Sequence, residues 1–126
     1  MRDNVRAFVR LAAEAFELGG PVYEFGSYLV DDQADRADLR PLFPGRQYVG
    51  CDMRAGPGVD RVEDLGGLKL ADATARTVLC VDTLEHVFEA RKAADEMIRV
   101  LAPGGALLIT GRWIFESMTI RAITGD

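Results

Sequence analysis

The sequence predicts an α/β fold, a Rossmann-like, doubly wound and mostly parallel sheet with helices on both faces. First, the apolar runs at residues 21–25, 47–51, 77–81 and 106–110 are largely continuous, as in strands that a parallel sheet buries on both faces. Second, segments whose apolar residues recur at helical spacing separate most of these runs. We expect the sheet to lack its last C-terminal strands, because residues 112–126 show no clear strand.

Length and composition favour a single domain. The chain has 126 residues, 48% hydrophobic and 28% charged, which suits one core. We divide it into an N-terminal helix (1–19), a core (20–111) and an apolar tail (112–126). The net charge of −5 disfavours nucleic acid as a partner, because counterion release needs a cationic surface. No apolar run reaches the roughly 18 residues of a membrane span and no signal peptide is evident, so we expect a cytoplasmic protein without a membrane partner.

Three helices and one further strand are expected between the apolar runs. Residues 3–18 carry apolar side chains at helical spacing and end before a Gly-Gly-Pro sequence. A shorter helix is predicted over 34–43, with acids in its first turn, and a longer one over 87–101. The Pro-Gly-Gly sequence at 103–105 should end the longer helix. A short edge strand is expected within 59–65.

The two cysteines are expected to be free, buried thiols. Cys51 and Cys80 both lie in apolar strand-like runs. In a doubly wound sheet the first strand should separate the strands that carry them, by about two spacings of 4.8 Å, which is beyond the reach of a disulfide. Since no cysteine–histidine cluster has the spacing of metal ligands, we predict no metal site.

The tail combines apolar residues with no recognisable element. We interpret it as the beginning of a truncated part of the domain, or as a surface that a second copy of the chain covers in a homodimer. Trp113 within it is expected to serve packing rather than to stack on a substrate.

Polar residues follow the predicted strands at what should be one edge of the sheet. Gly26 and Ser27 come after the first strand, Asp52 after the second, and Asp82 and Thr83 after the third clear one. Ligands of doubly wound sheets bind at this edge, where the strand order reverses.

Gly26 and Asp52 each have two interpretations. Gly26 permits a sharp turn and a close approach to a ligand, although a plain strand-to-helix turn would need it equally. Asp52 could accept both hydroxyls of a ribose, at about 1.5–3 kcal/mol for each hydrogen bond to a charged group. The alternative is a solvated acid at a strand end, and we favour the ligand role.

The loop after Gly26 limits which nucleoside-containing ligands the site could bind. It contains one glycine and then Asp31 and Asp32, whereas a dinucleotide site needs several glycines and a helix N-terminus that holds pyrophosphate. NAD, FAD and therefore a nicotinamide-dependent oxidoreductase are disfavoured. An adenosine ligand without phosphate and with a cationic centre, such as S-adenosylmethionine, would tolerate these acids.

Four segments together resemble the class I S-adenosylmethionine-dependent methyltransferases. They are Glu-Phe-Gly-Ser at 24–27, Tyr-Val-Gly-Cys-Asp at 48–52, Asp-Thr-Leu-Glu-His-Val at 82–87 and Arg-Val-Leu-Ala-Pro-Gly-Gly at 99–105. The Asp-Leu-Arg-Pro-Leu-Phe-Pro-Gly segment at 38–45 looks closest to small methyltransferase-domain proteins.

The resemblance extends over residues 20–111 and implies S-adenosylmethionine as cofactor. Its methionine end would lie against Glu24 and Gly26, its ribose hydroxyls on Asp52 and its adenine against Met53. The segment 62–65 matches the family's adenine-contacting stretch, whose usual acid either falls on Arg61 or is shifted to Glu63. The implied cofactor-binding residues are Glu24, Gly26, Ser27, Asp52, Met53, Glu63, Asp82, Thr83 and Leu84.

The resemblance implies methyl transfer to an unidentified acceptor, which we expect to be a small molecule. The alternative is a methyltransferase-like binding or regulatory module without activity, because the loop lacks its later glycines and the strands after the fifth are missing. His86, the only histidine, could act as a general base, but we favour a structural or pocket-shaping role. Glu85 and Glu89 are interpreted as solvated acids of a first helical turn.

Overall fold

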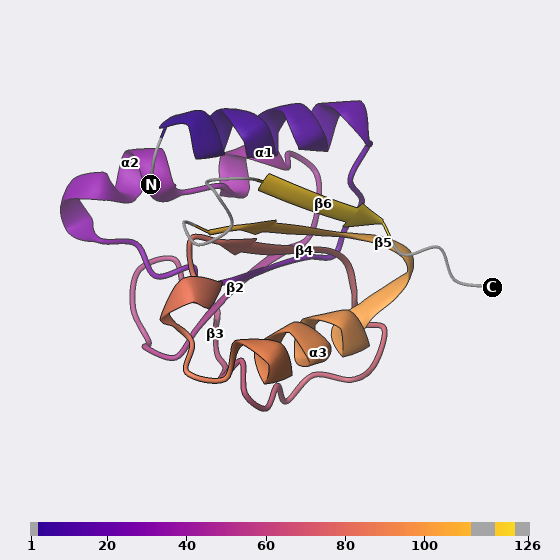
Figure 1. The fold of residues 1–126 in the computed structure, drawn as a ribbon. Coiled ribbons are helices and arrows are strands. Elements are labelled where there is room, and N and C mark those ends of the chain that lie inside the picture. Colours follow the sequence, from indigo (N-terminus) through magenta and orange to yellow (C-terminus); the bar gives the residue numbers. More distant parts are fainter. Residues whose placement is uncertain (1–2, 112–117, 123–126) are drawn as a thin grey trace.

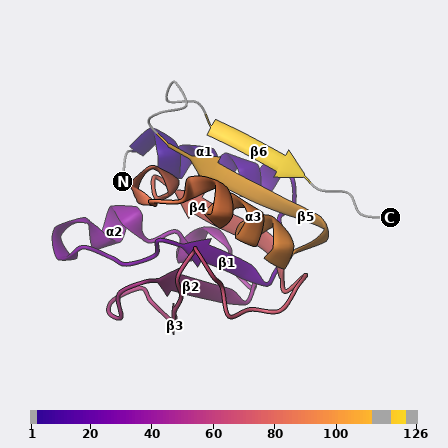
Figure 2. The ribbon, with the colours of Figure 1, turned by 60° about the horizontal axis from the view of Figure 1, so that its bottom comes forward.

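A computed structural model describes residues 3–111 and 118–122 (Figure 1). Within these ranges six strands form one sheet in the order β3-β2-β1-β4-β5-β6. All neighbouring strands are parallel except β5 and β6, which are antiparallel. Figure 2 shows β3 at one edge of the sheet and β6 at the other. The strands are β1 (Val22–Phe25), β2 (Tyr48–Asp52), β3 (Arg61–Val62), β4 (Ala75–Val81), β5 (Leu101–Thr110) and β6 (Met118–Ala122).

Helices cover both faces of this sheet, so the predicted fold class is confirmed. Helices α1 and α2 lie over one face and α3 over the other (Figure 1). The helices are α1 (Asp3–Ala15), α2 (Ala34–Ala37) and α3 (Ala90–Val100), and the 3-10 turns are η1 (Asp31–Gln33), η2 (Arg40–Leu42) and η3 (Leu84–His86).

Each long helix buries one apolar stripe. In α1 the side chains of Val5, Val9 and Ala12 recur at helical spacing and pack in the same cluster as Val22 and Leu108 of the sheet. In α3 the stripe is Ala93, Met97 and Val100, which belongs to the cluster on the opposite face. These two layers hold β1 and β4 at the centre of the molecule.

All three predicted helices have different bounds in the structure. Helix α1 ends at Ala15 and not at residue 18. The segment 34–43 is helical only in α2 and then forms the 3-10 turn η2, because Pro41 cannot donate the hydrogen bond that would continue an α-helix. The segment 87–101 begins as α3 only at Ala90, since Val87 has extended backbone (φ −91°, ψ 128°).

The Pro-Gly-Gly sequence at 103–105 lies inside β5 and does not separate helix from strand. Helix α3 ends at Val100 and β5 begins at the next residue. The register shifts here: Ala75 pairs with Leu101 and Thr77 with Ala106, so two steps along β4 correspond to five along β5. Gly104, with φ +80°, lies within this bulge.

The cysteines flank the central strand, as predicted. Phe25 of β1 pairs with Cys51 of β2 on one side and with Cys80 of β4 on the other. Both thiols are free and buried, and burial raises the pKa of each to about 12. The thiols are therefore unreactive in the folded protein.

The tail contains an element that the sequence analysis missed. Strand β6 pairs with β5 from Thr110–Met118 to Ala106–Ala122. Its sequence, Met-Thr-Ile-Arg-Ala, alternates apolar and polar residues, which is the signal of a strand. Trp113 lies outside the described residues, and the homodimer contact remains a prediction. Within the described ranges, none of the helices has the length and apolar character that crossing a bilayer requires.

Candidate functional site

A cavity of about 730 Å³ lies at the carboxyl ends of β1 and β2, close to the point where the strand order reverses between β1 and β4. Its volume is in the range of small-molecule sites. Its walls come from the strand ends, from the loop after β2, from the turn after β3 and from the segment between β4 and α3. The lining residues are Phe25, Gly26, Cys51, Asp52, Met53, Arg54, Glu63, Asp64, Leu65, Gly66, Gly67, Thr83, His86, Val87, Phe88, Glu89 and Lys92.

Gly26 forms the tight turn at the end of β1. Its φ is +88°, and a Cβ atom there would lie 2.1 Å from Oγ1 of Thr83. The amides of Gly26 and Ser27 both donate to the carbonyl of Cys51, at 2.8 and 3.0 Å. Only glycine fits this position, where the ends of β1 and β2 meet the segment after β4.

Asp52 presents its carboxylate at the end of β2. Its Oδ2 accepts the amide of Tyr28 at 3.1 Å and its Oδ1 accepts the amide of Arg54 at 3.1 Å. An ionised carboxylate has about four acceptor positions, two on each oxygen. Two of them are used, so each oxygen can accept one further hydrogen bond.

The loop after Gly26 is held against the loop after β2. Ser27 donates its hydroxyl to the carbonyl of Gly58 at 2.7 Å, and the amide of Leu29 donates to Pro57 at 2.9 Å. The guanidinium of Arg54 lies 3.8 Å from the centre of the Tyr28 ring. Ser27 therefore serves this packing, and it does not line the cavity.

Glu24 is enclosed next to Tyr48 and does not line the cavity. The Tyr48 hydroxyl donates to its carboxyl oxygen at 2.5 Å. Burial raises the pKa of Glu24 from 4.5 to about 7, although the Tyr48 hydrogen bond works in the opposite direction. Burial likewise raises the pKa of Tyr48, which stays protonated and can donate. The guanidinium of Arg40 lies 4.9 Å from the centre of the Tyr48 ring.

Glu63 anchors the turn that forms one wall of the cavity. Its side chain is almost fully buried, and its carboxylate accepts two hydrogen bonds from Arg61, at 2.8 and 3.0 Å, and one from the Lys69 amide at 2.8 Å. Within the wall, the amides of Gly66 and Gly67 donate to the Asp64 side chain and carbonyl, at 2.8 and 2.9 Å.

The predicted residues after β4 divide between cavity and core. Asp82, with φ +49°, receives the Thr110 hydroxyl on its carboxylate at 3.0 Å. Leu84 is buried in the apolar cluster on the α3 face of the sheet. Neither residue lines the cavity, whereas Thr83 and His86 do.

The structure thus brings six predicted residues to one cavity and places four elsewhere. Those at the cavity are Gly26, Asp52, Met53, Glu63, Thr83 and His86, and those outside its lining are Glu24, Ser27, Asp82 and Leu84. Sequence reasoning missed Phe88, which is fully exposed at the cavity. An aromatic residue among the polar residues before a helix was the available signal. Glu89 lines the cavity and is exposed, and the Glu85 side chain lies outside the described residues. Among the described residues, no group of His, Cys, Asp or Glu side chains could hold a metal ion.

Comparisons with known proteins agree with the fold. A family model described as a methyltransferase domain matches residues 38–109, more than half of the chain. No curated protein matches the sequence.

Solved structures share the fold at low sequence identity. The YcgJ protein from Bacillus subtilis is 18% identical, with a TM-score of 0.67 over 87% of this chain and 51% of that one. The cyclase SpnF is 21% identical, with a TM-score of 0.64 over 84% of this chain and 44% of that one. The methyltransferase CalH, solved with S-adenosylhomocysteine (SAH), is 16% identical, with a TM-score of 0.59 over 82% of this chain and 35% of that one.

The chain spans about half or less of the length of these three proteins. The family-model match carries the assignment, and the shared fold accords with it. The chain belongs to the methyltransferase domain family, and its resemblance to the class I S-adenosylmethionine-dependent methyltransferases is confirmed.

Proposed function

We propose that this chain binds S-adenosylmethionine in the cavity beside Asp52 and serves methyl transfer to a small-molecule acceptor. The observation that carries the proposal is the Asp52 carboxylate, which stands at the cavity with one acceptor position left on each oxygen. Two such positions match the two hydroxyls of one ribose. The family match and the SAH bound to CalH support the identity of the cofactor.

The charge of the cavity suits a cationic ligand. Its lining contains four acids and two cationic side chains. Arg54 lies against the Tyr28 ring and keeps its charge there, so acids outnumber cations in the lining by two. An acidic lining favours a sulfonium over a pyrophosphate, because like charges repel in a site partly shielded from water.

Apolar surface is available for an aromatic ring. Met53 is 68% exposed and Phe88 fully exposed, although both line the cavity. We assign Met53 to the adenine side, and Gly26 and Thr83 to the approach of the rest of the ligand.

Bound in this cavity, S-adenosylmethionine would supply a methyl group that is already activated. The chain therefore has to hold and orient the reactants, and orientation alone accelerates such reactions strongly. A base is needed only if the acceptor must lose a proton, and His86 lines the cavity.

Replacing Asp52 tests the proposal directly. Asp52→Ala is expected to raise the Kd for SAH at least tenfold, about 1.4 kcal/mol, because both ribose acceptors are lost. Asp52→Asn keeps one oxygen and should give a smaller loss. Titration calorimetry with SAH and with S-adenosylmethionine measures both effects, and NADH serves as the nucleotide that should not bind.

The control for charge is Asp95→Asn, an exposed acid of α3 outside the cavity lining. It removes the same charge and should leave the Kd unchanged. Because the Asp52 side chain also holds two loop amides, circular dichroism must show that the variants stay folded. A Kd for SAH that Asp52→Ala does not alter rejects the ribose role.

One observation favours an inactive binding module as the second candidate. Glu24, which the resemblance assigns to the methionine end of the cofactor, is covered by Tyr48 and does not line the cavity. The fold is shared with the cyclase SpnF, so fold alone does not define the reaction. Absence of heat and of a thermal shift at millimolar SAH and S-adenosylmethionine would favour this candidate.

A further inference from the structure

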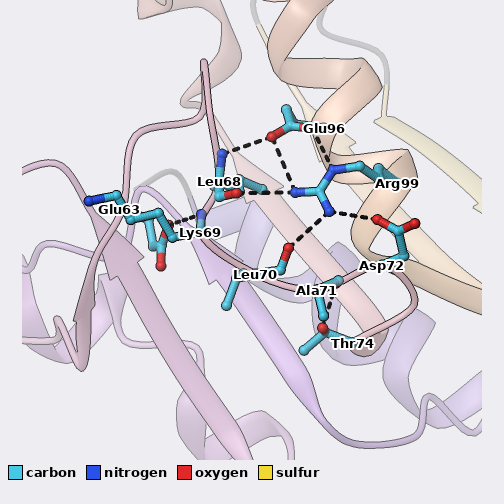
Figure 3. Close-up of polar contacts among 9 residues, drawn as sticks. All are labelled: Glu63, Leu68, Lys69, Leu70, Ala71, Asp72, Thr74, Glu96 and Arg99. Atoms are coloured by element: carbon cyan, nitrogen blue, oxygen red, sulfur yellow. Dashed lines mark hydrogen bonds and ion pairs between the residues drawn. The ribbon is translucent and has the colours of Figure 1, made fainter.

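Arg99 of α3 binds the main chain of residues 68–70, the segment that follows the cavity wall (Figure 3). Its guanidinium donates to the carbonyl of Leu68 at 3.1 Å and to that of Leu70 at 2.9 Å. It also pairs with Asp72 at 2.7 Å and with Glu96, one turn earlier in α3, at 2.7 Å. A planar guanidinium can make these contacts together because its five donors have a fixed geometry.

Glu96, on the same helix, binds the main chain of this segment as well. One of its oxygens accepts the Leu68 amide at 2.8 Å while the other accepts Nε of Arg99 at 2.7 Å (Figure 3). Both main-chain polar groups of Leu68 are thus bonded to side chains of α3. The Arg99 hydrogen bond also lowers the pKa of Glu96, which favours its charged, accepting form.

Residues 68–70 in turn bind Glu63, which belongs to the cavity wall. Lys69 lies between the two carbonyls that Arg99 binds, and its amide donates to Glu63 at 2.8 Å (Figure 3). The amide of Glu63 donates to the carbonyl of Asp52 at 2.9 Å. A continuous series of hydrogen bonds therefore connects α3 with Glu63 and Asp52 at the cavity.

Simple stabilisation by surface ion pairs does not account for this arrangement. Exposed ion pairs contribute little to stability, and the Asp72 side chain is 81% exposed. The bonds from Arg99 to the Leu68 and Leu70 carbonyls differ in kind, because they determine where a loop backbone lies. Neither Arg99 nor Glu96 lines the cavity.

We propose that Arg99, supported by Glu96, is a positioning residue for the ligand cavity. It holds the backbone of residues 68–70, this backbone orients Glu63, and Glu63 places the wall of residues 63–67 beside Asp52. The identity of the ligand rests on the proposed function, whereas the placement of the wall can be measured without any ligand.

Hydrogen exchange of the ligand-free chain tests the placement. Arg99→Ala is expected to speed exchange about tenfold at the Lys69 amide and also at the Gly66 and Gly67 amides of the wall. The Val78 amide in the central strand β4 should not change. Asp72→Ala is the matched control, since it removes an exposed partner of Arg99 and leaves both carbonyl bonds in place. It should change these rates less than twofold.

Affinity for SAH tests the consequence for the cavity. Arg99→Ala should raise the Kd about tenfold. Arg99→Lys keeps the positive charge but loses the planar set of N–H donors. We therefore expect most of the same loss of affinity for SAH. Arg46→Ala is the control for lowered stability. Arg46 is exposed, and its Nε binds the Leu18 carbonyl at 3.2 Å, in the layer on the α1 face of the sheet. The Kd of Arg46→Ala for SAH should equal that of the wild type.

The outcomes separate this proposal from the proposed function. Unchanged exchange at Gly66, Gly67 and Lys69 in Arg99→Ala overturns the positioning role, whatever the chain binds. Faster exchange with an unchanged Kd for SAH overturns its importance for the ligand. If the wild type does not bind SAH, the proposed function fails, and exchange in the wall alone decides whether Arg99 positions it.

Discussion

Gly26→Ala is expected to destabilise the folded state by about 3 kcal/mol or more. Overpacking costs about 1–3 kcal/mol, and a left-handed backbone costs a residue with a Cβ about 1–2 kcal/mol. The new methyl group would meet Thr83 at three atoms, of which Oγ1 at 2.1 Å is the nearest and Cβ at 2.9 Å the farthest. Thr83 is short and close to its own backbone, so it cannot swing away. Urea unfolding followed by circular dichroism measures the loss.

Gly45→Ala provides the matched control. Gly45 has a similar backbone, with φ +75°, but no atom lies within 4 Å of a Cβ built there. Gly45→Ala should therefore lose only the stability that the left-handed backbone costs, about 1–2 kcal/mol. Adding Thr83→Ala to Gly26→Ala removes the two nearest atoms and should recover part of the stability. Equal losses in Gly26→Ala and Gly45→Ala would contradict the close packing.

Glu24→Gln is expected to flatten the dependence of stability on pH. The pKa of Glu24 is about 7 in the folded protein, against an ordinary value of 4.5. Between these values the folded state binds the proton more tightly than the unfolded chain, so stability falls as pH rises from 4.5 to 7 and stays lower above pH 7. Glutamine carries no charge to desolvate. The advantage of Glu24→Gln over the wild type should grow by about 2 kcal/mol between pH 5 and pH 8.

Urea unfolding at half-unit steps from pH 5 to pH 8 measures this difference. Tyr48→Phe removes the hydroxyl that favours ionised Glu24, so the decline in stability should extend to higher pH. In the Glu24→Gln background the same substitution should cause no such extension. Parallel stability curves for the wild type and Glu24→Gln would show that Glu24 is not the titrating group.

Much of the fold was predictable because buried strands and amphipathic helices have opposite patterns. The continuous apolar runs located β1, β2, β4 and the second half of β5, and helical spacing located α1 and α3. The prediction failed where one residue decides between two local structures. Pro41 ended a helix early, and the glycines of 103–105 bent a strand rather than capping a helix.

The site was predictable only to the extent that strand ends meet at one edge. That rule alone predicts that Gly26 and Asp52 lie close together, and both line the cavity. It could not place Glu24, because all four residues of β1 are buried and no polar alternation marks the two faces. Tyr23 and Phe25 pack in one layer and Val22 in the other. Strand alternation therefore puts Glu24 on the face of Val22, and only the tertiary packing shows that Tyr48 covers it there.

The thiols of Cys51 and Cys80, on either side of Phe25, can report when the folded structure opens. Neither Cys51 nor Cys80 has any accessible surface, so an alkylating reagent can reach them only when the structure opens. Cys51 forms part of the cavity wall, whereas Cys80 lies in the centre of the sheet. Alkylation of Cys51 ahead of Cys80 would therefore signal a local opening at the cavity, and alkylation of both at one rate would signal global unfolding.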